Sequence, residues 1–201
     1  MIKLNIDGVN LEAKSGLTIL EIAKSNNIYI PTLCHMPKRD TRSVCRICIV
    51  EIEGLRGLHT ACSVEAKDGM VVQTNNEHVN STRKTLMEFV MAEHPVFGKT
   101  DKKIKELAKY LNVDKPRFSI PEKDVSRFEA ISSEYIKLDM SKCVHCDRCV
   151  RSCDYRKVIT RKGFGIYVSM AFDDDVSIEQ SNCVQCGDCI QACPSGAISR
   201  A

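Results

Sequence analysis

The sequence predicts an α+β fold, and three observations predict it. Residues 2–13 alternate between apolar and polar side chains as strands do, whereas residues 81–93 and 102–111 have apolar residues at helical spacing. The last part of the chain carries one cysteine pattern twice. We therefore expect a cysteine-bearing sheet domain, a helical connector with a linker and a second cysteine-bearing domain, over residues 1–78, 79–126 and 127–201.

The first domain is expected to begin with a β-hairpin over residues 2–13, because Asp7 and Gly8 form a tight-turn dipeptide between two alternating stretches. A helix is predicted to begin near Thr18, which forms a capping box with Glu21, and to end near residues 26–27. Two later apolar stretches are expected to be strands, at residues 49–52 and 70–72. This order of elements indicates a β-grasp module.

Four cysteines of the first domain have the spacing C-x10-C-x2-C-x13-C: Cys34, Cys45, Cys48 and Cys62. Plant-type ferredoxins hold a 2Fe-2S cluster with a related pattern, in which one loop wraps the cluster and a later segment closes the site. The four cysteines are therefore predicted to hold one 2Fe-2S cluster, with a zinc site as the alternative. His35 and His59 lie nearby in sequence and are interpreted as bystanders, since four cysteines already complete the pattern.

Eight further cysteines form two runs with the spacing C-x2-C-x2-C-x3-C, which is the pattern of bacterial ferredoxins with two 4Fe-4S clusters. In such proteins the fourth cysteine of each run ligates the other cluster. The ligands of one predicted cluster are Cys143, Cys146, Cys149 and Cys193. The ligands of the other are Cys183, Cys186, Cys189 and Cys153. Zinc sites are again the alternative, and disulfides are disfavoured because the sequence shows no secretory signal.

The connector is expected to hold two short helices that pack through apolar stripes. In the first, over residues 81–93, Leu86, Phe89 and Val90 share a face. The stripe of the second, over residues 102–111, consists of Ile104, Leu107, Ala108 and Leu111.

Three other segments have simpler interpretations. Residues 112–126 contain two prolines and are predicted to be linker. Residues 163–171 are expected to form a strand or hairpin between the two cysteine runs. The acidic run Asp173 to Asp175 is interpreted as a solvated turn rather than a metal site.

Composition excludes several classes of function. The 201 residues carry a formal net charge of +3 and twelve cysteines. Each oxidised cluster with its four thiolates is formally a dianion, so three clusters would make the net charge of the protein negative. The positive formal charge of the chain therefore does not indicate nucleic-acid binding. No apolar run is long enough to span a membrane, and no flavin or nicotinamide fingerprint is present. We expect a reducing cytoplasm, low in oxygen, and electron transfer by the clusters alone.

The residues around the first cysteines, C-H-M-P, C-R-I-C-I-V-E-I-E and H-T-A-C-S, resemble the N-terminal 2Fe-2S domain of the large iron–sulfur subunit of respiratory complex I. The same domain opens many iron-only hydrogenases and some NAD-linked formate dehydrogenases, and the resemblance covers nearly the whole chain. It implies a further cluster with one histidine and three cysteine ligands in the connector, and a catalytic part after the last cluster domain.

The sequence departs from that family in two places. His94 stands at the position of the cluster histidine, but Gly98, Asp101 and Leu107 occupy the three cysteine positions. One histidine cannot hold a cubane, so this histidine-ligated cluster is expected to be absent. The chain stops at Ala201, so no catalytic domain is expected after the cluster domains.

The resemblance implies an electron-transfer subunit of a multisubunit, electron-bifurcating oxidoreductase. It would relay single electrons between a flavin- and NAD(P)-binding partner and a second redox partner. Three alternatives stay open: a freestanding polyferredoxin, a partner subunit of a hydrogenase or formate dehydrogenase, and a redox or iron sensor. The sensor is disfavoured because the sequence offers no DNA-binding element.

Overall fold

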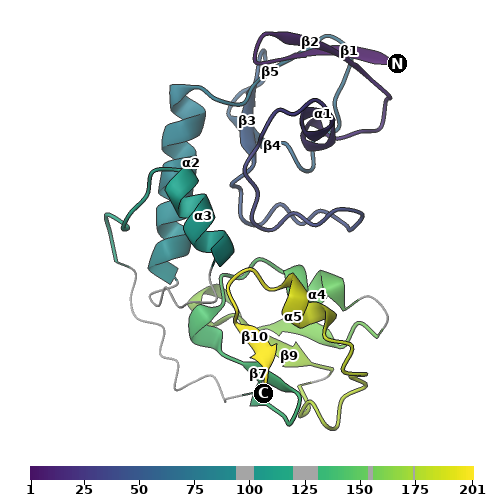
Figure 1. The fold of residues 1–201 in the computed structure, drawn as a ribbon, viewed down its shortest axis with the longest axis vertical. Helices are drawn as coiled ribbons and strands as arrows, with labels where there is room; N and C mark the ends of the chain where they lie inside the picture. Colours follow the sequence, from purple (N-terminus) through teal and green to yellow (C-terminus); the bar gives the residue numbers. More distant parts are fainter. Residues whose placement is uncertain (94–101, 120–130, 154–155, 174) are drawn as a thin grey trace. The chain divides into compact units, whose positions relative to one another are not determined.

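The computed structural model describes residues 1–93, 102–119, 131–153, 156–173 and 175–201. Helices and small sheets are mixed along the chain, as Figure 1 shows, and the predicted α+β fold is confirmed. The chain divides into two compact units. Unit 1 comprises Met1–Glu88 and Tyr110–Val113, and unit 2 comprises Phe89–Lys109 and Asp114–Ala201.

Unit 1 contains a 5-stranded sheet. Its elements are β1 (Ile2–Ile6), β2 (Val9–Ala13), α1 (Ile19–Ser25), β3 (Ile49–Ile52), β4 (Leu58–Thr60) and β5 (Met70–Gln73). The strand order is β2-β1-β5-β3-β4, in which β1 and β5 are parallel and the other neighbours are antiparallel. The predicted hairpin, helix and two later strands are all present, and β4 is an additional strand that the sequence analysis did not expect.

The apolar core of unit 1 joins α1 to the sheet. Seven fully buried side chains form its centre: Ile6, Ile19, Ile22, Ala23, Val50, Ala61 and Val72. The predicted capping box fixes the start of α1, since Thr18 Oγ1 accepts a hydrogen bond from Glu21 N at 3.2 Å and Glu21 Oε2 accepts one from Thr18 N at 2.8 Å. Cys48 and Cys62 belong to the same core cluster, so the packed core holds two of the predicted ligands.

Helix α2 (Glu77–Glu93) begins four residues before the predicted start at Ser81. Asn76 Oδ1 accepts a hydrogen bond from Val79 N at 2.8 Å and so caps the first turn. Apolar spacing does not predict this first turn, because residues 75–78 are polar.

The buried face of α2 also differs from the prediction. The predicted stripe is only partly buried, since Leu86 and Val90 are half-buried and Phe89 is 48% exposed, although its ring centroid lies 4.6 Å from that of Phe118. Four of its buried positions are four residues apart, namely Val79, Arg83, Met87 and Met91, and Glu88 is buried as well. An arginine interrupts this series, which explains why a search for apolar residues alone did not find it.

Helix α3 (Lys102–Tyr110) agrees with the prediction. Its predicted stripe is buried, with Ile104, Leu107, Ala108 and Leu111 all at 9% exposure or less. His94, Gly98 and Asp101 lie outside the described residues, as does the later half of the predicted linker. The absence of the histidine-ligated cluster therefore stays a prediction.

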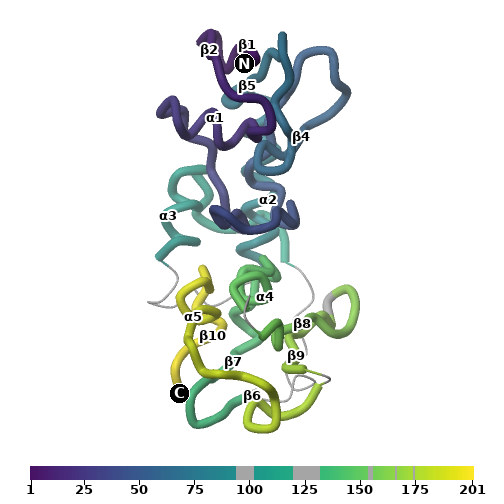
Figure 2. Tube along the Cα trace, turned by 90° about the vertical axis from the view of Figure 1, so that its right-hand side faces the viewer, coloured from purple at the N-terminus to yellow at the C-terminus, as the bar shows by residue number. Residues whose placement is uncertain are grey.

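From residue 131 onward, unit 2 is built from short elements, whose course Figure 2 follows in green and yellow. They are β6 (Ile131–Ser132), β7 (Ile136–Leu138), η2 (Met140–Lys142), α4 (Arg148–Ser152), β8 (Ile159–Lys162), η3 (Gly165–Tyr167), β9 (Ser169–Phe172), α5 (Asp188–Ala192) and β10 (Ile198–Arg200). One sheet has the order β10-β7-β6, and β8 pairs with β9 in a second sheet. Within the described part of the chain, no helix is both long and apolar enough to cross a membrane.

The hairpin between the two cysteine runs is present, but its predicted range is shifted. Its first strand is β8, which lies before the predicted residues 163–171, and the 3-10 turn η3 occupies the middle of that range. Within the acidic run after β9, Asp173 Oδ2 accepts a hydrogen bond from Asn182 N at 2.6 Å, and Asp175 pairs with Lys162 at 2.5 Å. These two carboxylates therefore hold loops in place, while Asp174 is not among the described residues.

Candidate metal centres

Four cysteines meet in unit 1: Cys34, Cys45, Cys48 and Cys62. The first two lie in the loop before β3, Cys48 directly precedes β3, and Cys62 follows β4. Cys34 N donates to Cys45 Sγ at 3.4 Å, and hydrogen bonding with the Cys34 thiol raises the pKa of Cys45. Hydrogen bonding with Cys62 likewise raises the pKa of Cys48. The site thus contains two thiol pairs, which suits two metal atoms with two thiolates each.

The pKa of the Cys62 thiol is lowered, in contrast to those of Cys45 and Cys48. Hydrogen bonding from Cys48 lowers the pKa of Cys62 to about 7, against the opposing effect of burial, and Ser43 contributes in the same direction. Ser43 Oγ lies 3.7 Å from Cys62 Sγ. Because the thiolate is the form that binds metal, this environment favours ligation. The sequence analysis did not name Ser43, and no spacing signal points to it.

The loop that carries Cys45 and Cys48 is tied to the strand that precedes Cys62. Arg46 adopts a left-handed conformation with φ 58° between the two cysteines, and its Nη2 donates to Leu58 O at 3.3 Å. Thr41 Oγ1 donates to Cys62 O at 3.1 Å. These contacts hold two distant segments of the sequence around one site. His35 and His59 are half-buried near the cysteines, and their predicted role as bystanders stays a prediction.

The two cysteine runs of unit 2 share one backbone conformation. His145 and Asp147 in the first run, and Gln185 and Gly187 in the second, have positive φ angles of 51°, 59°, 58° and 81°. Each run then enters a helix of 5 residues, α4 or α5, which ends directly before the fourth cysteine. The repeat in the sequence is therefore also a repeat in the structure.

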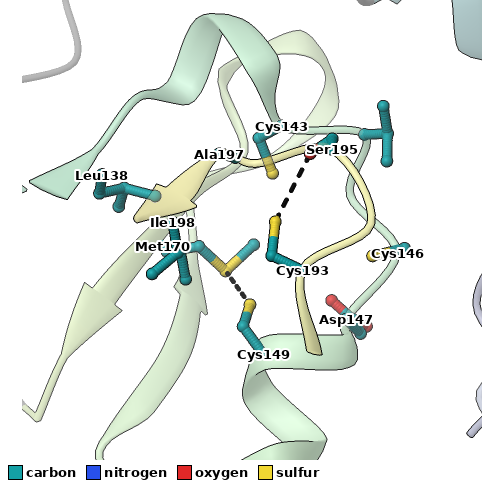
Figure 3. Close-up of a pocket in the computed structure, with 11 residues that line it drawn as sticks. Leu138, Cys143, Cys146, Asp147, Cys149, Met170, Cys193, Ser195, Ala197 and Ile198 are labelled. Carbon is teal, nitrogen blue, oxygen red and sulfur yellow. Dashed lines mark hydrogen bonds between the residues drawn. The ribbon is translucent and has the colours of Figure 1, made fainter. Parts of the chain in front are cut away.

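One pocket of unit 2 is lined by three cysteines of the first run and one of the second: Cys143, Cys146, Cys149 and Cys193. Figure 3 shows the thiols of Cys143, Cys149 and Cys193 pointing into the same space. Cys149 Sγ lies 4.0 Å from Met170 Sδ, and Cys193 Sγ lies 3.6 Å from Ser195 Oγ. Burial raises the pKa of Cys146 to about 12 and that of Cys149 well above its usual value. An uncharged thiol is therefore favoured here until a cation compensates the thiolates.

A second pocket collects the complementary set: Cys183, Cys186, Cys189 and Cys153. Burial raises the pKa of Cys189 to about 11, and the neighbouring thiols add to this effect. Cys186 is exposed, whereas the three cysteines from the first run in the other pocket are buried. The second pocket is therefore the more open of the two at its thiols.

Charged residues surround the loop of the first run. Asp147 is buried, and its Oδ2 accepts from Arg161 Nη1 at 3.2 Å. The buried guanidinium of Arg151 donates to Asp147 O at 3.2 Å and to Cys146 O at 3.3 Å. In the sequence, nothing but their positions near a cysteine run distinguishes these two arginines from other basic residues.

The structure thus brings all twelve cysteines together in the three sets that the spacing predicts, while their role as ligands stays a prediction. Among the described residues, no group of three or more His, Cys, Asp or Glu side chains is arranged to hold a single metal ion. Each set offers four thiols, and apolar side chains contribute to the lining of both pockets of unit 2. Four thiolates per site is the donor set of 2Fe-2S and 4Fe-4S clusters, so the residues fit these groups.

Comparison with protein-family models gives two matches. Residues 1–77 match a 2Fe-2S iron-sulfur cluster binding domain, and residues 142–197 match a 4Fe-4S dicluster domain. The cysteines of the three sets all lie within these two ranges.

Several curated proteins are similar over most of this chain. The second G-type subunit of the NADH-quinone oxidoreductase of Rhizobium meliloti is 35% identical over 77% of this chain, which corresponds to 19% of that protein. The HndD subunit of the NADP-reducing hydrogenase of Solidesulfovibrio fructosivorans is 32% identical over 86% of this chain and 32% of its own length. The gamma subunit of the NAD-reducing hydrogenase HoxS of Cupriavidus necator is 32% identical over 74% of this chain and 64% of its own length. The chain therefore spans less than two thirds of each of these relatives.

A solved structure shares the fold. It is described as the crystal structure of NAD+-reducing [NiFe]-hydrogenase in the H2-reduced state, and the matched chain superimposes with a TM-score of 0.86. The match covers 99% of this chain and 87% of that chain, at 24% sequence identity.

Proposed function

Since the chain belongs to the family of iron–sulfur subunits found in NADH-quinone oxidoreductases and NAD(P)-reducing hydrogenases, we propose that it relays single electrons between a flavin- and NAD(P)-binding partner and a second redox partner. The observation that carries this proposal is the gathering of all twelve cysteines into three four-thiol sites. Bound iron–sulfur clusters supply one-electron chemistry at such sites.

We assign the sites residue by residue. Cys34, Cys45, Cys48 and Cys62 would hold one 2Fe-2S cluster. Cys143, Cys146, Cys149 and Cys193 would hold one 4Fe-4S cluster, and Cys183, Cys186, Cys189 and Cys153 would hold the other. This gives about ten irons per chain, with no flavin or nicotinamide on this chain. The remaining residues hold the thiolates in position, and the apolar ones keep water from them.

The exposure of the thiols indicates where each unit would meet a partner. In unit 1, Cys45 is half-buried while the other three cysteines are buried. In unit 2, Cys186 is exposed, and Val184 beside it is 48% exposed. Electron transfer needs close approach of the two redox groups, so we place one partner contact near Cys45 and another near Cys186.

A hydrogenase or formate dehydrogenase is the second candidate for the complex, and the similarity to two hydrogenase subunits favours the former. In that case hydrogen or formate oxidation by a separate chain would deliver the electrons. In either case we place the complex in a reducing cytoplasm of an organism that lives with little oxygen, and electron bifurcation is a further proposal for it.

The test is anaerobic purification of the tagged chain from its source organism, followed by addition of NADH or NADPH under electron paramagnetic resonance. We expect a flavin-containing companion, and we expect NAD(P)H to reduce the clusters in the complex but not in the isolated chain. Hydrogen and formate are then added separately to identify a catalytic companion.

The matched control is Cys62→Ser, which should remove the 2Fe-2S signal and spare the 4Fe-4S signals. If electrons enter through unit 1, NAD(P)H should no longer reduce the 4Fe-4S clusters in this variant. A chain that purifies alone, with all its clusters, and that exchanges electrons directly with soluble enzymes would contradict the subunit role and favour a freestanding polyferredoxin.

A further inference from the structure

The largest fully buried side chain among the described residues is a cation. Arg83 of α2 is 2% exposed, and its Nη2 donates to Ile49 O at 2.7 Å. Its Nε has no hydrogen-bond partner, and no ion pair found in the described part of the chain includes it. Burial lowers the pKa of Arg83, but a guanidinium remains protonated in proteins.

A buried cation without a carboxylate partner destabilises a fold unless another negative charge compensates it. The charges that favour protonated Arg83 come from Tyr110, Cys48, Asp7 and Tyr29. The carboxylate of Asp7 already accepts hydrogen bonds from the amide and hydroxyl of Thr74. Of these four groups, Cys48 is the one that belongs to a predicted cluster site, where it would bind metal as a thiolate.

The geometry connects Arg83 to the four-thiol site of unit 1. Ile49, whose carbonyl accepts from Arg83, directly follows Cys48 in the sequence and begins β3. Glu88, the other buried charged residue of α2, lies five positions further on, or roughly 140° around the helix from Arg83. The cation therefore lies on the side of α2 that contacts β3.

We propose that Arg83 is the buried counter-charge of the 2Fe-2S site and raises its reduction potential. This inference rests on the proposed function, because it needs a cluster on the four cysteines of unit 1. Such a cluster with its thiolates is formally a dianion when oxidised and a trianion after it accepts one electron. A fixed cation nearby stabilises the trianion more than the dianion, so reduction becomes easier. Arg83 is thus a positioning residue that acts through its charge and does not ligate iron.

The test is a redox titration of the complete holo chain under electron paramagnetic resonance. Arg83→Met removes the charge but keeps an apolar side chain on the helix, and we expect a more negative midpoint potential for the 2Fe-2S cluster. Arg83→Lys keeps the charge and should restore most of the wild-type potential. Lys84→Met removes an exposed charge from the next position of the helix and should leave the potential unchanged. The 4Fe-4S potentials should be the same in all variants.

An unchanged 2Fe-2S potential in Arg83→Met would overturn the inference and leave Arg83 a structural role only. If Arg83→Met loses the cluster, Arg83→Gln, which retains a donor for Ile49 O, is titrated in its place. If both neutral variants lose the cluster while Arg83→Lys retains it, the site requires the charge and the inference stands. If Arg83→Lys loses it as well, the guanidinium geometry is what matters and the inference falls. A wild-type chain without any 2Fe-2S signal would instead remove the proposed function itself.

Discussion

Cys153 and Cys193 each complete the site of the cysteine run to which they do not belong. Cys153 directly follows α4 and lines the pocket of the second run, while Cys193 directly follows α5 and lines that of the first. Each helix begins beside one site, and the cysteine that follows its last residue lines the other. At the scale of single residues, a substitution should therefore affect the cluster that is distant in sequence.

Paired substitutions test this exchange. We expect Cys153→Ser to lower the iron content by about four irons per chain, from about ten to about six. Adding Cys186→Ser should cost little more iron, because both residues serve one cluster. Adding Cys146→Ser should remove about four more, because that residue serves the other cluster. Anaerobic iron analysis gives the counts, and the opposite pattern of additivity would mean that each run binds its cluster with its own four cysteines.

At the scale of elements, the start of α1 depends on the reciprocal hydrogen bonds of Thr18 and Glu21. Thr18→Ala should destabilise this helix by about 1 kcal/mol, the usual cost of losing an N-cap side chain. The expected result is faster hydrogen exchange at the amides of α1, with the amides of α3 unchanged as the internal control. Equal exchange in both proteins would mean that packing of α1 on the sheet fixes its start without the cap.

The same capping box should depend on pH. Hydrogen bonds from the backbone and side chain of Thr18 lower the pKa of Glu21 below its usual 4.5. Because the pKa of such a carboxylate is lower in the folded state than in the unfolded chain, the carboxylate contributes its full stabilisation at any pH above the unfolded pKa. This contribution is lost as the pH falls through the folded pKa. The difference in α1 exchange between wild type and Glu21→Gln should therefore be present at neutral pH and shrink as the pH falls below the usual 4.5 and through the lowered pKa of Glu21. A difference that is constant with pH would exclude the charge of Glu21 as its cause.

For the whole molecule, the sequence predicted most where local rules decide the structure. The alternation of apolar and polar residues predicted the hairpin of unit 1, and the capping box predicted the start of α1. The cysteine spacing predicted the three sets of thiols. The short strands β6, β7 and β10 were missed, because segments of two or three residues carry too little pattern to detect. Arg83 was missed because its burial depends on tertiary contacts with β3 rather than on its residue type.

The two units differ in what their cores contain. The core of unit 1 includes Cys48 and Cys62, but most of it consists of aliphatic side chains that join α1 to a five-stranded sheet. The core of unit 2 includes the thiols of Cys143, Cys149 and Cys189, with short strands and two helices of 5 residues around them. A small core that contains ligand thiols needs bound metal to offset the conformational entropy of folding. Unit 2 should therefore depend more strongly on its clusters than unit 1.

Anaerobic removal of iron by a chelator, followed by hydrogen exchange, measures this difference. We expect the amides of β7, β9 and β10 to lose protection, because their core loses the metal that holds its thiols together. The amides of β1, β3 and β5 should keep most of theirs, because aliphatic packing remains. Cys62→Ser is the control, since it should empty only the site of unit 1 and leave unit 2 protected. Simultaneous loss of protection in both units would mean that the sheet of unit 1 is as dependent on its cluster as unit 2.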